Sequence, residues 1–322
     1  MRAWRLEETG GRPVLRTTAL GPPGAGEIRV AIRACGLNFA DLLMVQGKYQ
    51  ERHPLPFTLG MEFAGVVEAL GPGVDGPPPG TRVAICAGHG GLAETGNFPA
   101  GRCIPLPEGM SFEEAAAFQI AYGTSHLALG HRARLQPGET LLVLGAAGGV
   151  GLTAVEIGKR MGARVIASAR GAERLKIARA AGADVLIDSE AGDLRDRVRA
   201  EGGADVVYDA VGGPAFGEAL RATNPEGRML IIGFASGEVP PIPANILLVK
   251  NIDVIGFYWG GYFGFAPSVL TQSLSTLFGW YAEGGLRPHV SHVLPFDQAP
   301  EGLDLLRRRA ATGKVVVRIR GD

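Results

Sequence analysis

The sequence is poor in cysteine and shows no excess of charge of either sign. Its 322 residues include only three cysteines, Cys35, Cys86 and Cys103. Three thiols are too few for a disulfide framework or for a four-thiolate zinc site. Lysine plus arginine number 32 and aspartate plus glutamate number 32, so the formal net charge is +0. Because a neutral chain exerts no long-range attraction on polyanions, we expect no nucleic-acid partner.

Long apolar runs are also missing. Glycine, proline and charged residues interrupt every apolar window before it reaches the length of a membrane-spanning helix. The first ten residues mix charges of both signs and lack the apolar stretch of a secretory signal. We therefore expect a cytoplasmic protein without a membrane partner.

The chain has 322 residues, of which 46% are hydrophobic, and this exceeds what one hydrophobic core usually contains. Two domains are therefore expected. In the middle of the sequence, short β-branched runs alternate with helical segments, which is typical of a parallel sheet covered by helices on both faces. The six expected strands are Thr140–Leu144, Arg164–Ala169, Asp184–Asp188, Asp205–Asp209, Met229–Ile232 and Ile252–Ile255. Six is the number in a complete dinucleotide-binding sheet.

The two ends of the chain have a different character. The first 120 residues contain proline runs and isolated glycines between short strand-like segments, which indicates a mostly β domain rich in turns. The tail contains two helical stretches and a last strand, namely Ser268–Ala282, Ala299–Arg309 and Val315–Ile319. We assign this tail to the first domain, so that residues 123–262 are inserted between residues 1–122 and residues 263–322. A cleft is expected between the two domains.

A glycine loop follows the first strand of the expected sheet. The run Gly145–Gly151 lies between that strand and a helical segment, which is the place of a phosphate-binding loop. Glycines let the backbone approach a pyrophosphate, whose charge lies at the amino end of the helix. The alternative is an ordinary glycine turn between core elements. We expect the pyrophosphate of a dinucleotide to bind at Ala147, Gly148, Gly149 and Val150.

The end of the second expected strand favours NADPH over NADH. An NAD enzyme places an acidic residue there to bind the ribose hydroxyls. This sequence has Ser168, Arg170 and Arg174 in that region instead, a hydroxyl and two guanidinium groups that suit a phosphate dianion. The alternative is that the two arginines are solvated surface residues.

Eight motifs, spread along nearly the whole chain, resemble those of one family in the same order. They are Met1–Trp4, Gly36–Asp41, Leu59–Val67, Gly90–Glu94, Gly145–Gly151, Asp209–Gly212, Gly256–Gly260 and Gly313–Val317. In these motifs the chain resembles the zinc-free quinone oxidoreductase branch of the medium-chain dehydrogenase/reductase superfamily. The resemblance implies an α/β fold, with a doubly wound Rossmann sheet inserted into a mostly β, GroES-like catalytic domain. It also implies NADPH as the cofactor and a homodimer.

The resemblance further implies which residues form the site. It places Asn38, Asp41 and Tyr49 in the active cleft beside the nicotinamide as catalytic residues. It brings six more residues to the cofactor, namely Thr124, Gly212, Gly233, Phe257, Trp259 and Lys314. The sequence departs from many relatives at Leu43, where they have a second tyrosine, and at Ser189, where some have a tyrosine near the adenosine phosphate.

No metal is expected. In the zinc alcohol dehydrogenases related to this branch, the positions of Asn38, Met61 and Gln119 carry cysteine, histidine and cysteine ligands. Amide and thioether groups in those places do not make a zinc site. Without a Lewis acid, a simple carbonyl becomes a poor hydride acceptor, whereas a conjugated acceptor spreads the arriving charge. We therefore expect hydride transfer from NADPH to quinones or other small α,β-unsaturated carbonyl compounds.

Within the site, we expect Tyr49 to donate a hydrogen bond to the acceptor oxygen, with ordinary packing as the alternative. Asp41 is expected to anchor the loop that carries Asn38, and Glu62 is expected to be structural. We also expect the edge of the last Rossmann strand, around Ile252–Ile255, to pair with its mate in the homodimer.

Two alternatives remain for the function. Enoyl-thioester reduction, as in an enoyl-CoA reductase, uses the same hydride transfer to a conjugated carbonyl on the same fold. A dinucleotide-binding structural or RNA-binding protein is the other. It is considered because some proteins of the resembled family are lens structural proteins and some bind RNA. The one compact basic run, Arg307–Arg309, lies in a helical segment where a solvated charged face is the ordinary explanation.

Overall fold

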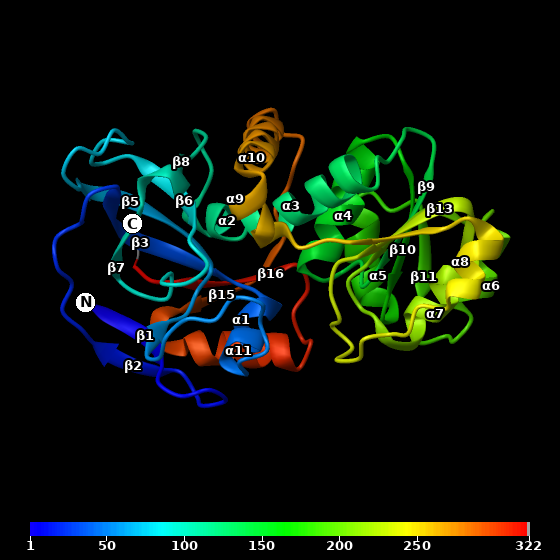
Figure 1. Cartoon of the computed structure of the whole chain (residues 1–322), viewed down its shortest axis with the longest axis horizontal. Coiled ribbons are helices and arrows are strands. Elements are labelled where there is room, and N and C mark those ends of the chain that lie inside the picture. Colours follow the sequence, from blue (N-terminus) through cyan, green and yellow to red (C-terminus); the bar gives the residue numbers. More distant parts are fainter. Residues whose placement is uncertain (321–322) are drawn as a thin grey trace. The chain divides into compact units, whose positions relative to one another are not determined.

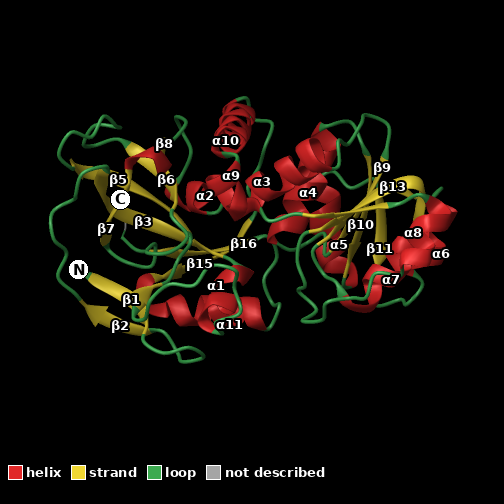
Figure 2. Cartoon of the chain, viewed as in Figure 1, coloured by secondary structure: helices red, strands yellow, loops and turns green. Residues whose placement is uncertain are grey.

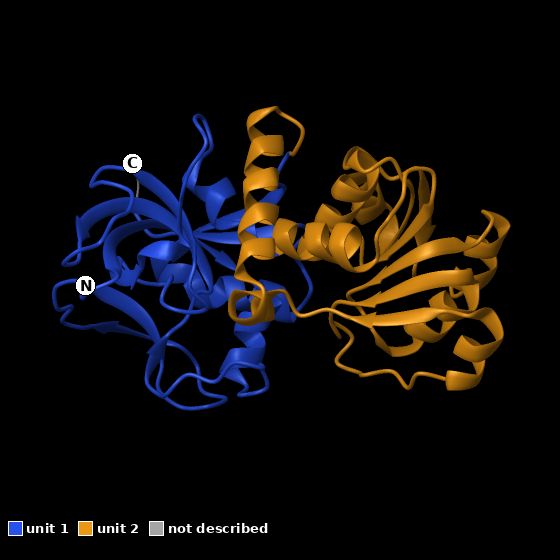
Figure 3. Cartoon of the chain, turned by 45° about the horizontal axis from the view of Figure 1, so that its top comes forward, with its two compact units in different colours: residues 1–120, 287–322 blue, residues 121–286 orange. Residues whose placement is uncertain are grey.

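The chain forms two compact units in the computed structural model, which describes residues 1–320 (Figure 3). Unit 1 joins residues 1–120 to the residues from Arg287 onward, and unit 2 is the contiguous stretch Ala121–Leu286. Unit 2 is therefore inserted into unit 1 along the chain. Its end differs from the expected boundary, because residues 263–286 cluster with unit 2 and not with the residues that complete unit 1.

Helix α10, Pro267–Ala282, accounts for this difference. The Oγ atom of Ser273 lies 2.7 Å from Nδ1 of His126, and the guanidinium carbon of Arg160 lies 4.7 Å from the centre of a Trp280 ring. All four residues belong to unit 2. Apolar spacing predicts that this segment is a helix, but it does not identify the domain against which the helix packs.

Six parallel strands form the sheet of unit 2, in the spatial order β11-β10-β9-β12-β13-β14. This is the order of a doubly wound Rossmann sheet, and it confirms the expected α/β fold. Strands β9, β10, β11 and β13 of this sheet are labelled in Figure 1. The strands are β9 (Thr140–Leu144), β10 (Arg164–Ala169), β11 (Val185–Asp188), β12 (Ala204–Asp209), β13 (Thr223–Ile231) and β14 (Asp253–Gly256). Strand β13 begins earlier than the expected Met229, because it continues through an irregular stretch in which Glu226 has a φ of 60°.

Helices alternate with these strands along unit 2 (Figure 2). They are α3 (Gln119–His126), η2 (Leu127–Arg132), α4 (Gly149–Arg160), α5 (Gly171–Ala180), α6 (Leu194–Ala200), α7 (Gly213–Ala222), α8 (Ala244–Lys250), η3 (Trp259–Gly261), α9 (Tyr262–Phe265) and α10. Val198 and Phe216 from the helices share one buried core with Leu142 and Val207 from the strands. Within residues 1–320, no helix combines the length and the apolar character needed to cross a membrane.

Unit 1 is mostly β, as expected. Its larger sheet has seven strands in the order β15-β16-β3-β5-β6-β8, with β7 paired to β3, and a smaller sheet has the order β2-β1-β4. The strands are β1 (Arg2–Leu6), β2 (Val14–Thr17), β3 (Glu27–Leu37), β4 (Phe57–Thr58), β5 (Glu62–Leu70), β6 (Arg82–Cys86), β7 (Thr95–Pro99), β8 (Cys103–Pro105), β15 (Val290–Pro295) and β16 (Lys314–Arg318). The helices are α1 (Phe39–Val45), η1 (Ala100–Arg102), α2 (Phe112–Ala116), η4 (Phe296–Gln298) and α11 (Ala299–Arg307).

The register of the larger sheet brings three strand ends together. Gly36, near the end of β3, pairs with Glu62 at the start of β5 and with Val316 in the middle of β16, and the next residue of β3, Leu37, pairs with Val315. A Cβ atom on Gly36 would lie 2.0 Å from the carbonyl oxygen of Ala116, so the backbone of α2 packs directly on β3 at this point. Side chains that follow β3 or that begin β5 and β16 therefore meet.

Candidate active site

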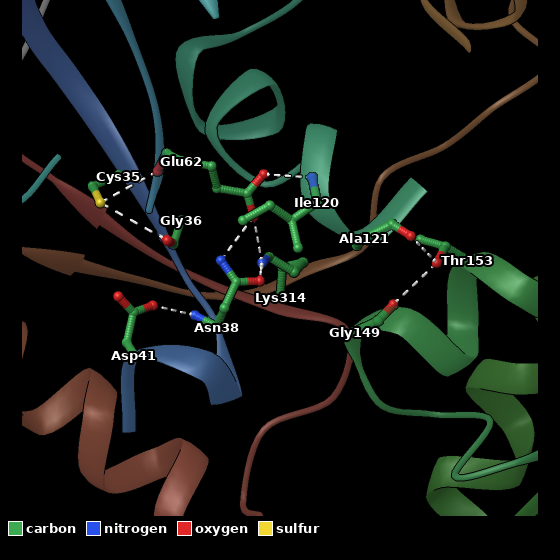
Figure 4. Close-up of polar contacts among 10 residues, drawn as sticks. All are labelled: Cys35, Gly36, Asn38, Asp41, Glu62, Ile120, Ala121, Gly149, Thr153 and Lys314. Atoms are coloured by element: carbon green, nitrogen blue, oxygen red, sulfur yellow. Dashed lines mark hydrogen bonds and ion pairs between the residues drawn. The ribbon is translucent and has the colours of Figure 1, made fainter. Parts of the chain in front are cut away.

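Three polar side chains of unit 1 form a closed cluster where these strand ends meet (Figure 4). Asn38 precedes α1, Glu62 is the first residue of β5, and Lys314 is the first residue of β16. The Lys314 Nζ atom donates to Oδ1 of Asn38 over 2.6 Å and to Oε1 of Glu62 over 2.7 Å. The Nδ2 atom of Asn38 donates to the same Glu62 oxygen over 3.0 Å.

The ion pair in this cluster is buried. The side chain of Glu62 is 0% exposed and that of Lys314 is 7% exposed. The second oxygen of Glu62 accepts the backbone N–H of Ile120 over 3.0 Å, so the carboxylate is satisfied on both oxygens. Removing one partner of such a pair leaves an uncompensated buried charge, which costs about 3–5 kcal/mol.

Asp41 lies in the first turn of α1, buried, with both carboxylate oxygens bound to backbone N–H groups. Oδ2 accepts from Asn38 over 2.8 Å and Oδ1 accepts from Gly60 over 3.3 Å. Burial raises the pKa of Asp41 to about 6, while the bond from the Asn38 N–H acts in the opposite direction. These contacts tie the residue before α1 to the segment before β5, which is the arrangement expected of an anchor for Asn38.

Tyr49 lies in the bend that follows α1, four residues after the helix ends at Val45, and its side chain is half-buried. Of the three positions expected to carry metal ligands in zinc relatives, Met61 and Gln119 are buried, 6% and 1% exposed, and Asn38 is half-buried. Within residues 1–320, no three His, Cys, Asp or Glu side chains gather into a group that could hold a metal ion.

In unit 2, the glycine loop has the geometry that a phosphate cradle requires. Gly145 adopts a φ of 69°, and the N–H of Gly148 donates to the carbonyl oxygen of Gly145 over 2.9 Å. A Cβ atom on Gly151 would lie 2.2 Å from that same oxygen, so this close approach requires glycine. Gly148 occupies the N-cap of α4 and offers no side chain to satisfy the first N–H groups of the helix.

The four expected pyrophosphate residues surround this helix start. Ala147 is 3% exposed, Gly148 is exposed, and Gly149 and Val150 are half-buried in the first turn of α4. The donors at the amino end of a helix of 12 residues suit an anionic group, because the helix dipole places partial positive charge there. The loop therefore fits a dinucleotide pyrophosphate.

The expected adenosine-phosphate residues follow strand β10. Ser168 is 2% exposed within the strand, whereas Arg170 is exposed at the N-cap of α5 and Arg174 lies one helical turn further on, half-buried. Arg170 and Arg174 therefore suit the binding of an anion at this strand end better than the buried Ser168.

Sequence reasoning missed Asp188 at the neighbouring strand end, where β11 pairs it with Ala169. Oδ1 of Asp188 accepts the N–H groups of Glu190 and Gly171, over 3.0 Å and 3.1 Å, and these bonds lower the pKa of the carboxyl group. The feature of the sequence that could have identified Asp188 is its position at the end of the third expected strand. Asp188 fixes the start of α5 and hence the backbone that carries Arg170.

The remaining expected cofactor residues of unit 2 lie near the carboxyl ends of β12, β13 and β14. Oδ1 of the buried Asp209 accepts the N–H of Gly212 over 2.9 Å, and the backbone oxygen of Asp209 accepts the N–H of Gly233 over 3.3 Å. Burial raises the pKa of the Asp209 carboxyl group. Phe257 follows β14 and donates its N–H to Ile231 in β13. The structure thus brings Gly212, Gly233 and Phe257 to the strand ends at which Rossmann sheets bind ligands.

Trp259 follows β14 by three residues and Thr124 lies in α3, before the first strand of the sheet, and both are buried. Trp259 packs against α3, where a Cβ atom on Gly123 would lie 2.6 Å from its Nε1 atom. Lys314, the last of the expected cofactor residues, lies in unit 1, where its side chain binds Asn38 and Glu62.

Known proteins resemble the chain over nearly its whole length. Residues 24–108 match the alcohol dehydrogenase GroES-like domain, and residues 149–277 match the zinc-binding dehydrogenase family. Quinone oxidoreductase-like protein 2 of Bos taurus is 41% identical over 298 residues, which cover 91% of this chain and 85% of that protein. The chain belongs to the zinc-free quinone oxidoreductase branch of the medium-chain dehydrogenase/reductase superfamily.

Two solved structures of quinone oxidoreductases support this membership. The enzyme from Thermus thermophilus, solved also as its NADPH complex, has a TM-score of 0.89 and 38% identity over 99% of this chain and 100% of that chain. The Escherichia coli enzyme, complexed with NADPH, has a TM-score of 0.91 and 29% identity over the same shares. The match to the zinc-binding dehydrogenase family covers residues 149–277, a range that includes none of Asn38, Met61 and Gln119.

Proposed function

We propose that this oxidoreductase transfers hydride from NADPH to quinones or other small α,β-unsaturated carbonyl compounds without a metal. The observation that carries the proposal is the pairing of a glycine phosphate loop with Arg170 and Arg174 in unit 2, while unit 1 has amides and a thioether at the metal positions. NADPH, when bound, supplies the hydride. The NADPH complexes of the two quinone oxidoreductases described above support the choice of cofactor.

The residues of unit 2 would bind and orient the cofactor. The N–H groups at the start of α4 would receive the pyrophosphate, where Gly148 leaves room for close approach. The guanidinium groups of Arg170 and Arg174 would receive the additional phosphate that distinguishes NADPH from NADH. Positioning contributes much of the rate in such a reaction, because it removes the entropic cost of bringing the reactants together.

The residues of unit 1 would receive the acceptor. An amide N–H of Asn38 and the phenol of Tyr49 are the groups that would donate to an acceptor oxygen as charge develops on it. A hydroquinone anion is weakly basic, so water can supply its proton. Asp41 would hold the Asn38 loop, since both of its carboxylate oxygens are bound to the backbone.

We place the activity in the cytoplasm, with a small-molecule substrate and with no nucleic-acid or membrane partner, because the chain is neutral overall and its apolar runs are short. We also propose a homodimer. Its contact would be the free edge of β14, because that strand is the last in the spatial order of the sheet.

A panel of acceptors tests the reaction. Quinones, enones, enoyl thioesters and simple aldehydes are offered in turn with NADPH and with NADH, and cofactor oxidation is followed by absorbance. The proposal expects turnover of quinones or enones with NADPH and little reaction with aldehydes. A clear preference for enoyl thioesters would establish the other reductase activity, and reduction of simple aldehydes at rates similar to quinones would refute the metal-free mechanism.

A further inference from the structure

We propose that the buried Lys314–Glu62 ion pair orients and polarises the Asn38 side chain, so that its amide presents one N–H to the oxygen of the acceptor. Lys314 and Glu62 are then positioning residues and Asn38 is the group that touches substrate. The proposal rests on the hydride transfer proposed above and adds the device that stabilises charge on the acceptor.

The two charged neighbours determine which way the amide faces. A lysine ammonium only donates hydrogen bonds and an ionised carboxylate only accepts them. Lys314 lies 2.6 Å from Oδ1 of Asn38, and Glu62 lies 3.0 Å from Nδ2. A flipped amide would place its NH₂ group against the ammonium and its carbonyl oxygen against the carboxylate. Both contacts would be repulsive, so a single orientation is held.

This orientation leaves one donor for a ligand. The NH₂ group of Asn38 has two N–H bonds, and one of them goes to Glu62. Among residues 1–320, the other N–H has no acceptor. Asn38 is half-buried, whereas Glu62 and Lys314 are buried. The amide is therefore the member of the cluster that a small molecule can reach.

The ion pair also sets the strength of this donor. The Lys314 ammonium draws electron density toward Oδ1, and linked hydrogen bonds strengthen one another in a medium of low dielectric constant. The positive charge of Lys314 further offsets the negative charge of Glu62, so the oxygen of an acceptor does not face an unbalanced carboxylate. Loss of Lys314 would therefore remove the polarisation of the Asn38 amide and would also leave the negative charge of Glu62 to repel the acceptor oxygen.

The test uses variants that separate this role from folding. Lys314→Met removes the ammonium but leaves Glu62 buried without its ion-pair partner, so we expect this variant to be less stable than the wild type. The double variant Lys314→Met with Glu62→Gln removes both charges and keeps the cluster neutral. Lys314→Arg keeps the charge and serves as the rescue. Lys159→Met is the control, because it removes a lysine from a partly exposed ion pair with Asp184 in unit 2.

Three readouts are measured on folded protein: kcat and KM with a quinone and with an enone, the Kd of NADPH from fluorescence, and the titration of bound para-nitrophenol from its absorbance. In the double variant we expect kcat for the enone to fall about a hundredfold, as for loss of one oxyanion donor, with quinone reduction falling about tenfold at most. The Kd of NADPH should stay within about twofold of wild type, whereas a loss of about 1.4 kcal/mol of binding free energy would raise it tenfold. Lys314→Arg should restore most of the enone rate.

The nitrophenol titration is independent of turnover, because it reports whether the site stabilises an oxyanion. The wild type should lower the apparent pKa of the bound phenol relative to the double variant, while Lys159→Met should match the wild type. Equal pKa values in the wild type and the double variant would overturn the proposal, as would an unchanged enone kcat or a selective loss of NADPH affinity. If the wild type reduces no acceptor, the proposed function fails, and the titration still decides whether Lys314 acts on an oxyanion through Asn38.

Discussion

Substitution of Gly151 by alanine tests the phosphate loop most directly. A Cβ atom at this position would lie 2.2 Å from the carbonyl oxygen of Gly145, 2.8 Å from its carbonyl carbon and 3.0 Å from Cα of Ala146. All three are backbone atoms, so no side chain can rotate away. Because an ordinary carbon–oxygen contact is about 3.3 Å, the loop and the first turn of α4 must separate by about 1 Å.

A displacement of this size should weaken NADPH binding strongly. The donors at the start of α4 are aligned for a pyrophosphate only while the loop keeps its close approach, and a misplacement of about 1 Å at a positioned site costs about a hundredfold. We therefore expect the Kd of NADPH to rise about a hundredfold, equivalent to about 2.8 kcal/mol. Fluorescence titration of NADPH measures the Kd. Overpacking should also destabilise the fold by about 1–3 kcal/mol, which denaturant unfolding measures.

A matched control is available in helix α10. A Cβ atom on Gly279 would meet nothing within 4 Å. Gly279→Ala should leave the Kd of NADPH unchanged and stabilise the protein by about 0.5–1 kcal/mol, because alanine is the better helix former. The reasoning is refuted if Gly151→Ala binds NADPH as tightly as the control does.

Four further predictions concern the cofactor, the metal, the acceptor and the assembly. Arg170→Ala should weaken NADPH about tenfold or more and leave NADH affinity unchanged, since only NADPH offers a phosphate for a charged hydrogen bond; equal losses in paired titrations would contradict this. Mass spectrometry should find no stoichiometric zinc, and chelators should not slow turnover, because Asn38, Met61 and Gln119 supply neither thiolate nor imidazole; one tightly held zinc per chain would overturn the mechanism. Tyr49→Phe should lower quinone turnover by about tenfold at most and enone turnover by about a hundredfold, since the enolate is the stronger base; an equal fall for both would make Tyr49 a group that only positions substrate. Light scattering at micromolar concentration should give the mass of a homodimer, whereas a monomer would exclude pairing at the β14 edge.

Local patterns in the sequence predict the Rossmann sheet well. Strands β9 and β10 begin and end at the expected residues, because their β-branched runs are bounded by charged or glycine residues. For β13 the predicted start, Met229, is too late. The segment Asn224-Pro-Glu-Gly227 has the composition of a turn, so the sequence pattern does not assign it to the strand. In the structure these residues belong to the strand, with Glu226 in a left-handed conformation.

The contacts of the candidate site were harder to predict. The glycine loop is local, so its function follows from one short segment between a strand and a helix. The partner of Glu62 is Lys314, 252 residues further along the chain, and no local pattern links the two. Sequence reasoning placed Lys314 with the cofactor residues and gave Glu62 a structural role. Their pairing depends on the register of β3, β5 and β16, which is a tertiary property of unit 1.

The insertion of unit 2 has a consequence for the order in which the molecule assembles. During synthesis the whole of unit 2, Ala121–Leu286, is translated before β15 and β16. Domains fold as units, so the nucleotide-binding half can close first although it comes second in the chain. Strand β16 then has to enter the larger sheet between β15 and β3, and it brings Lys314 with it. The charged pair beside Asn38 is therefore completed only after Lys314 has been made, and a chain that stops short of β16 has a nucleotide-binding unit but no ammonium in the cluster beside Asn38.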